Sequence, residues 1–135
     1  MIQYAIDKGN RLTRVWMSGG NSSADLARHY SVVLDDPNYD PTFDTLFHIA
    51  GDAGGPILAE LPEAGQLLEA LAQLQHRRKW AVVMRPGLRR TVVEFLLTGV
   101  ELGTVQMRFF DDDLQALTWL DQQRNSAVVQ QACRG

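Results

Sequence analysis

Apolar and polar residues alternate at the start of the chain with the spacing of a half-buried strand. This alternation runs over residues 2–7, and a second apolar stretch occupies 12–17. A Lys-Gly-Asn sequence at 8–10 lies between them and is typical of a tight turn. The pattern therefore predicts a β-hairpin over residues 2–17.

Beyond the hairpin, three predicted strands alternate with predicted helices. Dense or alternating apolar residues indicate strands over 43–50, 80–84 and 105–109. Each of the four helices has a local signal at one end or along one side. These signals are an N-cap at Ser22 or Ser23 with a stop at Pro37, a start near Pro62, the apolar set Val92, Val93, Leu96 and Leu97, and an acidic start at Asp111, Asp112 and Asp113.

Helical spacing also predicts which side chains face the core. The expected inward residues are Leu26, Tyr30, Val33 and Leu34 in the first helix, Leu67, Leu68, Leu71 and Leu74 in the second, and Leu117 and Leu120 in the last. The three tryptophans, Trp16, Trp80 and Trp119, are expected in the core or at its margins because they bury large apolar surfaces.

The element order β-β-α-β-α-β-α-β-α predicts an α/β fold. Strands joined through helices form right-handed parallel crossovers, which place the helices against the sheet. We therefore expect a mixed five-stranded sheet with an N-terminal β-hairpin and flanking helices. A length of 135 residues suits one domain. That domain is assigned to residues 1–123, with 124–135 as a loosely ordered C-terminal tail.

Composition and charge narrow the classes of function. The chain has a formal net charge of -3, so the basic footprint of a nucleic-acid-binding domain is absent and no nucleic-acid partner is expected. One cysteine, Cys133, rules out an internal disulfide and a cysteine zinc cluster. The first residues lack the features of a signal peptide, and no apolar run is long enough to cross a bilayer. We expect a cytoplasmic protein that is not membrane-integral.

Several stretches in a fixed order resemble the SpoIIAA-like family of STAS/SEC14-type domains. They are the hairpin ending in Trp16, the sequence Leu-Asp-Asp-Pro-Asn-Tyr-Asp at 34–40, Arg-Lys-Trp-Ala-Val-Val at 78–83, and the strand and acidic cap at 105–112 followed by Ala116, Leu117, Trp119 and Leu120. The resemblance covers about residues 2–122 and implies a STAS-like fold. Relatives include anti-sigma-factor antagonists and lipid-carrying modules.

The sequence departs from those antagonists at one informative position. They carry a phosphorylatable Ser or Thr where the central strand meets the next helix. Here that joint, residues 51–56, reads Gly-Asp-Ala-Gly-Gly-Pro and has no hydroxyl group. A phosphoserine switch at this joint is therefore not expected.

The best candidate site lies where the parallel strands end, because ligands of open α/β sheets bind outside the carboxyl ends of the strands. Segments 18–23, 51–57, 85–90 and 110–113 are expected to gather there. The candidate ligand-binding residues are Arg85, Arg89, Arg90, Gly19, Gly20, Asp52 and Gly54. Arginine at a helix start opposes the helix dipole, and a bound anion would offset that cost. The alternative is that Arg89 and Arg90 are solvated or pair with Asp112 or Glu94.

The sequence contains no assembled set of nucleophile, base and acid. His48 and Asp52 form an acid–base pair only if the loop folds back, and a histidine inside an apolar strand more often has a structural role. No second imidazole stands at ligand spacing from His29 or His76, and the aspartates at 111–113 suit helix capping, so neither a metal nor a cofactor is expected.

Three functional hypotheses follow from these observations. The leading one is a non-catalytic regulatory or ligand-binding module for a small anionic or lipid-like molecule. A second is a protein-interaction module or homodimer that pairs through the edge strand 2–7. A third is a small-molecule enzyme that uses His48 and Asp52.

Overall fold

The chain folds around one mixed β-sheet of five strands. The structure is a computed structural model that describes residues 1–50, 61–75 and 77–121. The strands are β1 (Ile2–Asp7), β2 (Leu12–Met17), β3 (Asp44–Ile49), β4 (Lys79–Met84) and β5 (Gln106–Phe110), and they lie in that order across the sheet. β1 is antiparallel to β2, and every later pair is parallel. The α/β class and the mixed sheet with its N-terminal hairpin are thus confirmed.

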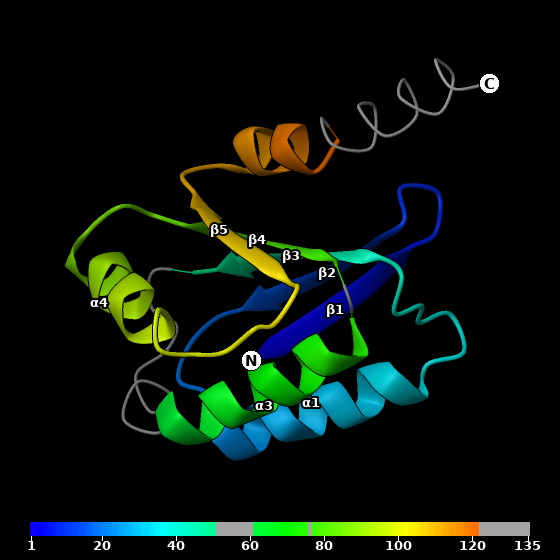
Figure 1. Ribbon diagram of the computed structural model, residues 1–135, viewed down its shortest axis with the longest axis horizontal. Coiled ribbons are helices and arrows are strands. Elements are labelled where there is room, and N and C mark those ends of the chain that lie inside the picture. The colour runs from blue at the N-terminus through cyan, green and yellow to red at the C-terminus, as the bar shows by residue number, and fades with distance from the viewer. Residues whose placement is uncertain (51–60, 76, 122–135) are drawn as a thin grey trace.

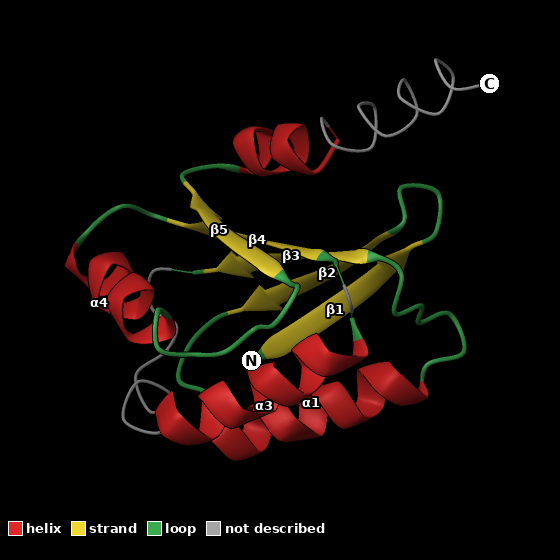
Figure 2. Cartoon of the chain, viewed as in Figure 1, coloured by secondary structure: helices red, strands yellow, loops and turns green. Residues whose placement is uncertain are grey.

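Helices cover both faces of the sheet. α1 (Ser23–Asp35) and α3 (Leu61–Leu74) lie side by side on one face. Residues 113–121 form a helix on the opposite face, and α4 (Leu88–Leu97) stands at the margin of the molecule (Figures 1 and 2). This arrangement leaves β1 and β5 as the two edge strands of the sheet.

The larger part of the core lies between the sheet and the α1–α3 layer. It is centred on Trp80, which is fully buried, and Phe47 packs edge-on against the Trp80 ring. On the other face, Leu12, Leu46 and Ala81 are buried beneath helix 113–121. The predicted inward residue Leu120 and its neighbour Trp119 are both buried there. Trp16 is less buried than the other two tryptophans, since it is 36% exposed.

α1 begins at a capping box. The Ser22 hydroxyl oxygen accepts a hydrogen bond from the Asp25 backbone nitrogen, and the Asp25 carboxylate accepts one from the Ser22 backbone nitrogen. Leu26, Tyr30 and Val33 face inward as predicted. The prediction for Leu34 is wrong: this residue is 40% exposed, because the fourth inward position of the helix is taken by His29.

The end of α3 corrects a second packing prediction. Helical spacing predicts Leu74 in the buried stripe, but this residue is 56% exposed. The position one turn after Leu71 is Gln75, which is almost completely buried and is therefore the residue that points inward. Its amide bonds to the indole of Trp80 and to the Phe43 carbonyl, so a polar side chain continues the stripe.

Candidate functional site

The carboxyl ends of β2, β3, β4 and β5 lie at one end of the sheet, because these four strands are parallel. The segments that follow them therefore leave the sheet at the same end, as the sequence predicts. Asp52 and Gly54 lie outside the residues that the structure describes. The segments after β2 and β4 are separated by β3, so parallel order alone does not bring their residues together.

Arg90 is held by a set of acceptors within the protein. Its Nε donates to a carboxylate oxygen of Glu94 at 2.8 Å, and its guanidinium also bonds to Asp111 and to the Met84 carbonyl. The two carboxylates raise the pKa of Arg90, and the hydrogen bond to Glu94 is the largest influence. Partial burial acts in the opposite direction but is weaker. Arg90 therefore pairs with Glu94, as the alternative prediction states. Its second partner is Asp111 and not Asp112.

The other two arginines differ from Arg90 in their surroundings. Arg85 and Arg89 are both exposed, at the N-terminal end of α4. Asp112 serves the neighbouring helix, because its carboxylate accepts a hydrogen bond from the Gln115 backbone nitrogen at 2.8 Å. The capping role expected of the acidic run is therefore present at Asp112.

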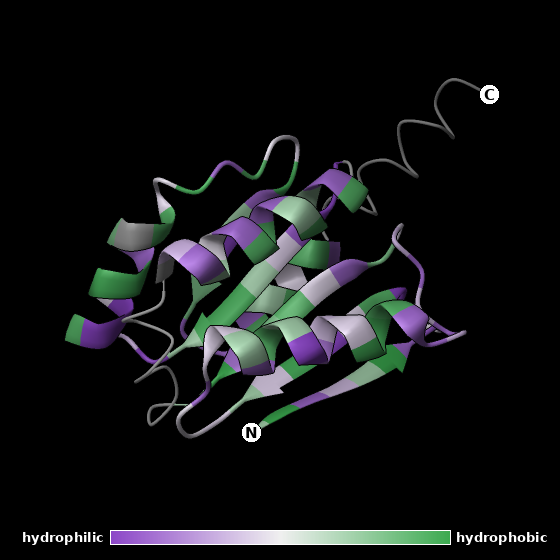
Figure 3. Ribbon diagram, turned by 90° about the horizontal axis from the view of Figure 1, so that it is seen from below, coloured by the Kyte–Doolittle hydropathy of each residue, from purple (hydrophilic) through white to green (hydrophobic). Residues whose placement is uncertain are grey.

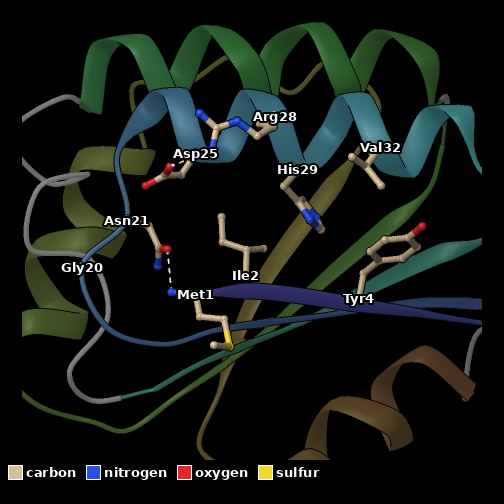
Figure 4. A pocket seen from close by; sticks show the side chains of 9 residues that line it. All are labelled: Met1, Ile2, Tyr4, Gly20, Asn21, Asp25, Arg28, His29 and Val32. Carbon is tan, nitrogen blue, oxygen red and sulfur yellow. Dashed lines mark hydrogen bonds and ion pairs between the residues drawn. The ribbon is translucent and has the colours of Figure 1, made fainter.

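Gly19 and Gly20 lie beside a different feature, a cavity between β1 and α1. Gly19 has a φ of +69°, a conformation that favours glycine, and turns the chain from β2 toward α1. Gly20 lines the cavity, which has a volume of about 390 Å³. Its other lining residues are Met1, Ile2, Tyr4, Asn21, Asp25, Arg28, His29 and Val32 (Figure 4). None of the three candidate arginines lines it.

The cavity has a polar end and an apolar end. At the polar end the Asn21 amide oxygen accepts a hydrogen bond from the Met1 nitrogen at 2.8 Å, and Arg28 lies 3.7 Å from Asp25. Ile2 and Val32 supply apolar surface from opposite walls (Figure 4). The hydrogen bonds from Ser22 lower the pKa of Asp25, so its carboxylate stays charged. The loose Arg28–Asp25 pair leaves the guanidinium accessible, since that side chain is 76% exposed.

His29 is a buried titratable residue in the wall of this cavity. It hangs from α1 toward β1, between Ile2 and Tyr4 (Figure 4), and is only 8% exposed. Its Nε2 is buried and has no hydrogen-bond partner within the described part of the chain. A buried polar atom without a partner costs free energy.

The burial of His29 predicts a pH dependence of stability. Burial lowers the pKa of this imidazole below its ordinary value of 6.5. The unfolded chain therefore binds the proton more readily than the folded chain. The contribution of neutral His29 to the free energy of unfolding is complete above pH 6.5, and it declines as the pH falls toward the pKa of the folded protein. We expect His29→Phe to flatten the decline in the free energy of unfolding between about pH 7.5 and pH 5. Urea titrations at several pH values would measure it, and an unchanged slope would contradict the assignment.

His48 lies beside Asp113, whereas Asp52, its partner in the enzyme hypothesis, lies outside the described residues. Its Nδ1 lies 2.9 Å from the Asp113 carboxylate, and its ring stacks on Trp16 with centroids 5.3 Å apart. Burial is the largest influence on the pKa of His48 and lowers it, against the opposing charge of Asp113. The Nε2 atom is buried, so the dyad does not present a free ring nitrogen to a substrate. The geometry favours a structural tie between β3 and helix 113–121.

The cavity was missed because its residues come from segments that look ordinary in sequence. One signal was present: His29 falls between Leu26 and Val33 on the inward side of α1, where a histidine needs a partner. The strand alternation also places Ile2 and Tyr4 on the face of the sheet that meets α1. The cavity itself depends on the distance between β1 and α1, which no local pattern records.

Comparison of the chain with protein-family models, with curated proteins and with solved structures finds no match. In the part of the chain that the structure describes, every helix is too short or too polar to cross a membrane. The same described residues contain no group of three or more His, Cys, Asp or Glu side chains placed to hold a metal ion.

Proposed function

We propose that the protein is a non-catalytic, STAS-like ligand-binding or regulatory module. We infer that its ligand is a small amphipathic molecule with a carboxylate group, bound in the cavity between β1 and α1. The observation that carries the proposal is the lining of that cavity, which combines the exposed Arg28 guanidinium with apolar surface from Ile2 and Val32. The five-stranded mixed sheet with its opening hairpin supports the STAS-like assignment.

The chemistry of the lining supports this class of ligand. Arg28 suits a carboxylate at the polar end, where the N-terminus of α1 also favours negative charge. Ile2 and Val32 suit a short aliphatic part. The site thus differs from the arginine site considered from sequence, because Arg90 is already paired with two carboxylates.

The test is a thermal-shift series with aliphatic carboxylates of about four to eight carbons, a size suited to a small pocket. Alcohols of the same chain lengths serve as neutral comparators. At tenfold excess over Kd a carboxylate stabilises the fold by about 1.4 kcal/mol, which raises the Tm by roughly 3–6 °C. We expect the alcohols to have a much smaller effect.

Two charge-reversal variants locate the site. Arg28→Glu is expected to weaken carboxylate binding by about tenfold or more, because it replaces a charge-assisted partner by a repulsive one. Lys8→Glu makes the same change of charge in the hairpin turn and should leave binding unaltered. Equal responses to carboxylates and alcohols would refute the carboxylate preference. Equal loss in both variants, or no response to any probe, would refute the cavity as the site.

A further inference from the structure

The exposed face of α4 is apolar. Leu88 is 82% exposed, Phe95 is 73% exposed and Val92 is 39% exposed. These residues stand at positions i, i+4 and i+7, so they form one stripe along the helix. We call Leu88, Val92 and Phe95 the α4 stripe. A surface helix of a domain that acts alone normally directs such a stripe inward.

The inward face of α4 explains why the stripe points outward. Arg90 and Glu94, one turn apart, are bonded to each other on the less exposed side of the helix. Arg90 also reaches Asp111 at the end of β5 and lies 5.9 Å from the centre of the Phe109 ring. This polar anchor fixes the rotation of α4 about its own axis. Turning the stripe inward would break these bonds and expose Arg90 and Glu94 in its place.

The charge around the stripe is opposite to that of the whole chain. Residues 85–95 contain three arginines and one carboxylate, whereas the full sequence has a formal net charge of -3. Arg90 is paired with this carboxylate, Glu94, and with Asp111, so it adds no net positive charge to the surface. Arg85 precedes the stripe and Arg89 follows Leu88 directly, and both are exposed. The outer surface of α4 therefore combines apolar side chains with positive charge.

The exposure and charge of this surface favour a lipid bilayer as its partner. α4 stands at the margin of the molecule, where hydrophobic and hydrophilic residues alternate along its ribbon (Figure 3). Leu88 and Phe95 have most of their surface exposed. An exposed apolar stripe flanked by arginine matches the headgroup region of an anionic bilayer, which takes up apolar side chains and attracts basic ones. A two-fold contact between two α4 helices would instead bring like-charged flanks together.

We propose that the α4 stripe, with the exposed Arg85, is a docking surface for an anionic lipid bilayer. Leu88 and Phe95 enter the boundary between headgroups and acyl chains, and the Arg85 guanidinium contacts a lipid phosphate. The contact is peripheral and reversible, since one short helix buries little apolar area. This surface is separate from the cavity between β1 and α1, so either proposal stands if the other fails.

The test is co-sedimentation of the full chain with sucrose-loaded vesicles at low salt. We expect binding to vesicles of equal parts phosphatidylcholine and phosphatidylglycerol, and none to phosphatidylcholine alone. Leu88→Ser/Phe95→Ser should reduce the partition coefficient at least about tenfold, because it removes the inserted apolar surface. The control is Leu114→Ser, which changes an equally exposed leucine (74%) on helix 113–121 and should leave binding unchanged.

A second pair of variants tests the charge. Arg85→Glu changes the charge by two units and should weaken binding to anionic vesicles by about fivefold or more per unit, whereas Lys8→Glu should have little effect. Binding that does not depend on anionic lipid, or equal losses in the stripe variant and in Leu114→Ser, would overturn the proposal. Light scattering would also overturn the proposal if it showed a dimer that becomes monomeric in Leu88→Ser/Phe95→Ser, because the stripe would then join two copies of this chain.

Discussion

Replacing Gln75 by methionine is expected to lower the free energy of unfolding by about 2–4 kcal/mol. Gln75 is 1% exposed, and its side chain makes two buried hydrogen bonds. The amide nitrogen donates to the Phe43 carbonyl at 3.2 Å, and the amide oxygen accepts from the Trp80 indole at 2.8 Å. Methionine fills a similar volume but leaves both partners unsatisfied away from water, which costs about 1–3 kcal/mol for each group.

Urea denaturation of the wild-type protein and four variants, Gln75→Met, Gln66→Met, Trp80→Phe and Gln75→Met/Trp80→Phe, would measure this effect and its cause. Gln66→Met is the matched control, since Gln66 is exposed on the same helix and its replacement should change stability by less than about 0.5 kcal/mol. In the double variant Gln75→Met/Trp80→Phe the indole donor is gone, so the combined loss should be smaller than the sum of the single losses. Strict additivity would show that the Gln75–Trp80 hydrogen bond does not cause the destabilisation.

Much of the fold could be predicted from the sequence because the spacing of apolar and polar residues indicates each strand of the sheet. Alternation at 2–7 and the following turn give the hairpin, and the apolar runs give the three parallel strands. Gln75 shows where the pattern fails. The apolar pattern of the helix extends the buried stripe to Leu74. The buried indole of Trp80 needs a hydrogen-bond acceptor, however, and Gln75 at the inward position supplies it. Such a requirement appears only when both elements are in place.

The candidate site was harder to predict because its partners come from distant segments. The sequence offered Asp112 or Glu94 for Arg90, and the structure adds Asp111, which comes close because β5 lies beside β4. His48 meets Asp113 for a similar reason, since helix 113–121 packs back over the sheet. A sequence shows that a charged residue needs a partner, but sheet order decides which residue that partner is.

The second large effect is expected at Leu120, where alanine should lower the free energy of unfolding by about 2–5 kcal/mol. Leu120 is 1% exposed and packs in a cluster with Leu46 and Ala81, which belong to the central strands β3 and β4. Removing most of its side chain leaves a cavity between the helix and the sheet that rigid strands cannot close.

The same helix supplies the matched control for this loss. Leu114 is 74% exposed, so Leu114→Ala should change stability by less than about 0.5 kcal/mol. Both variants alter one leucine in residues 113–121, so their difference isolates packing against the sheet from helix propensity. Thermal and urea denaturation would measure both. A small effect at Leu120 would mean that the sheet is stable without this helix and that the cooperative domain ends near β5, whereas the expected large loss makes helix 113–121 part of the same folding unit.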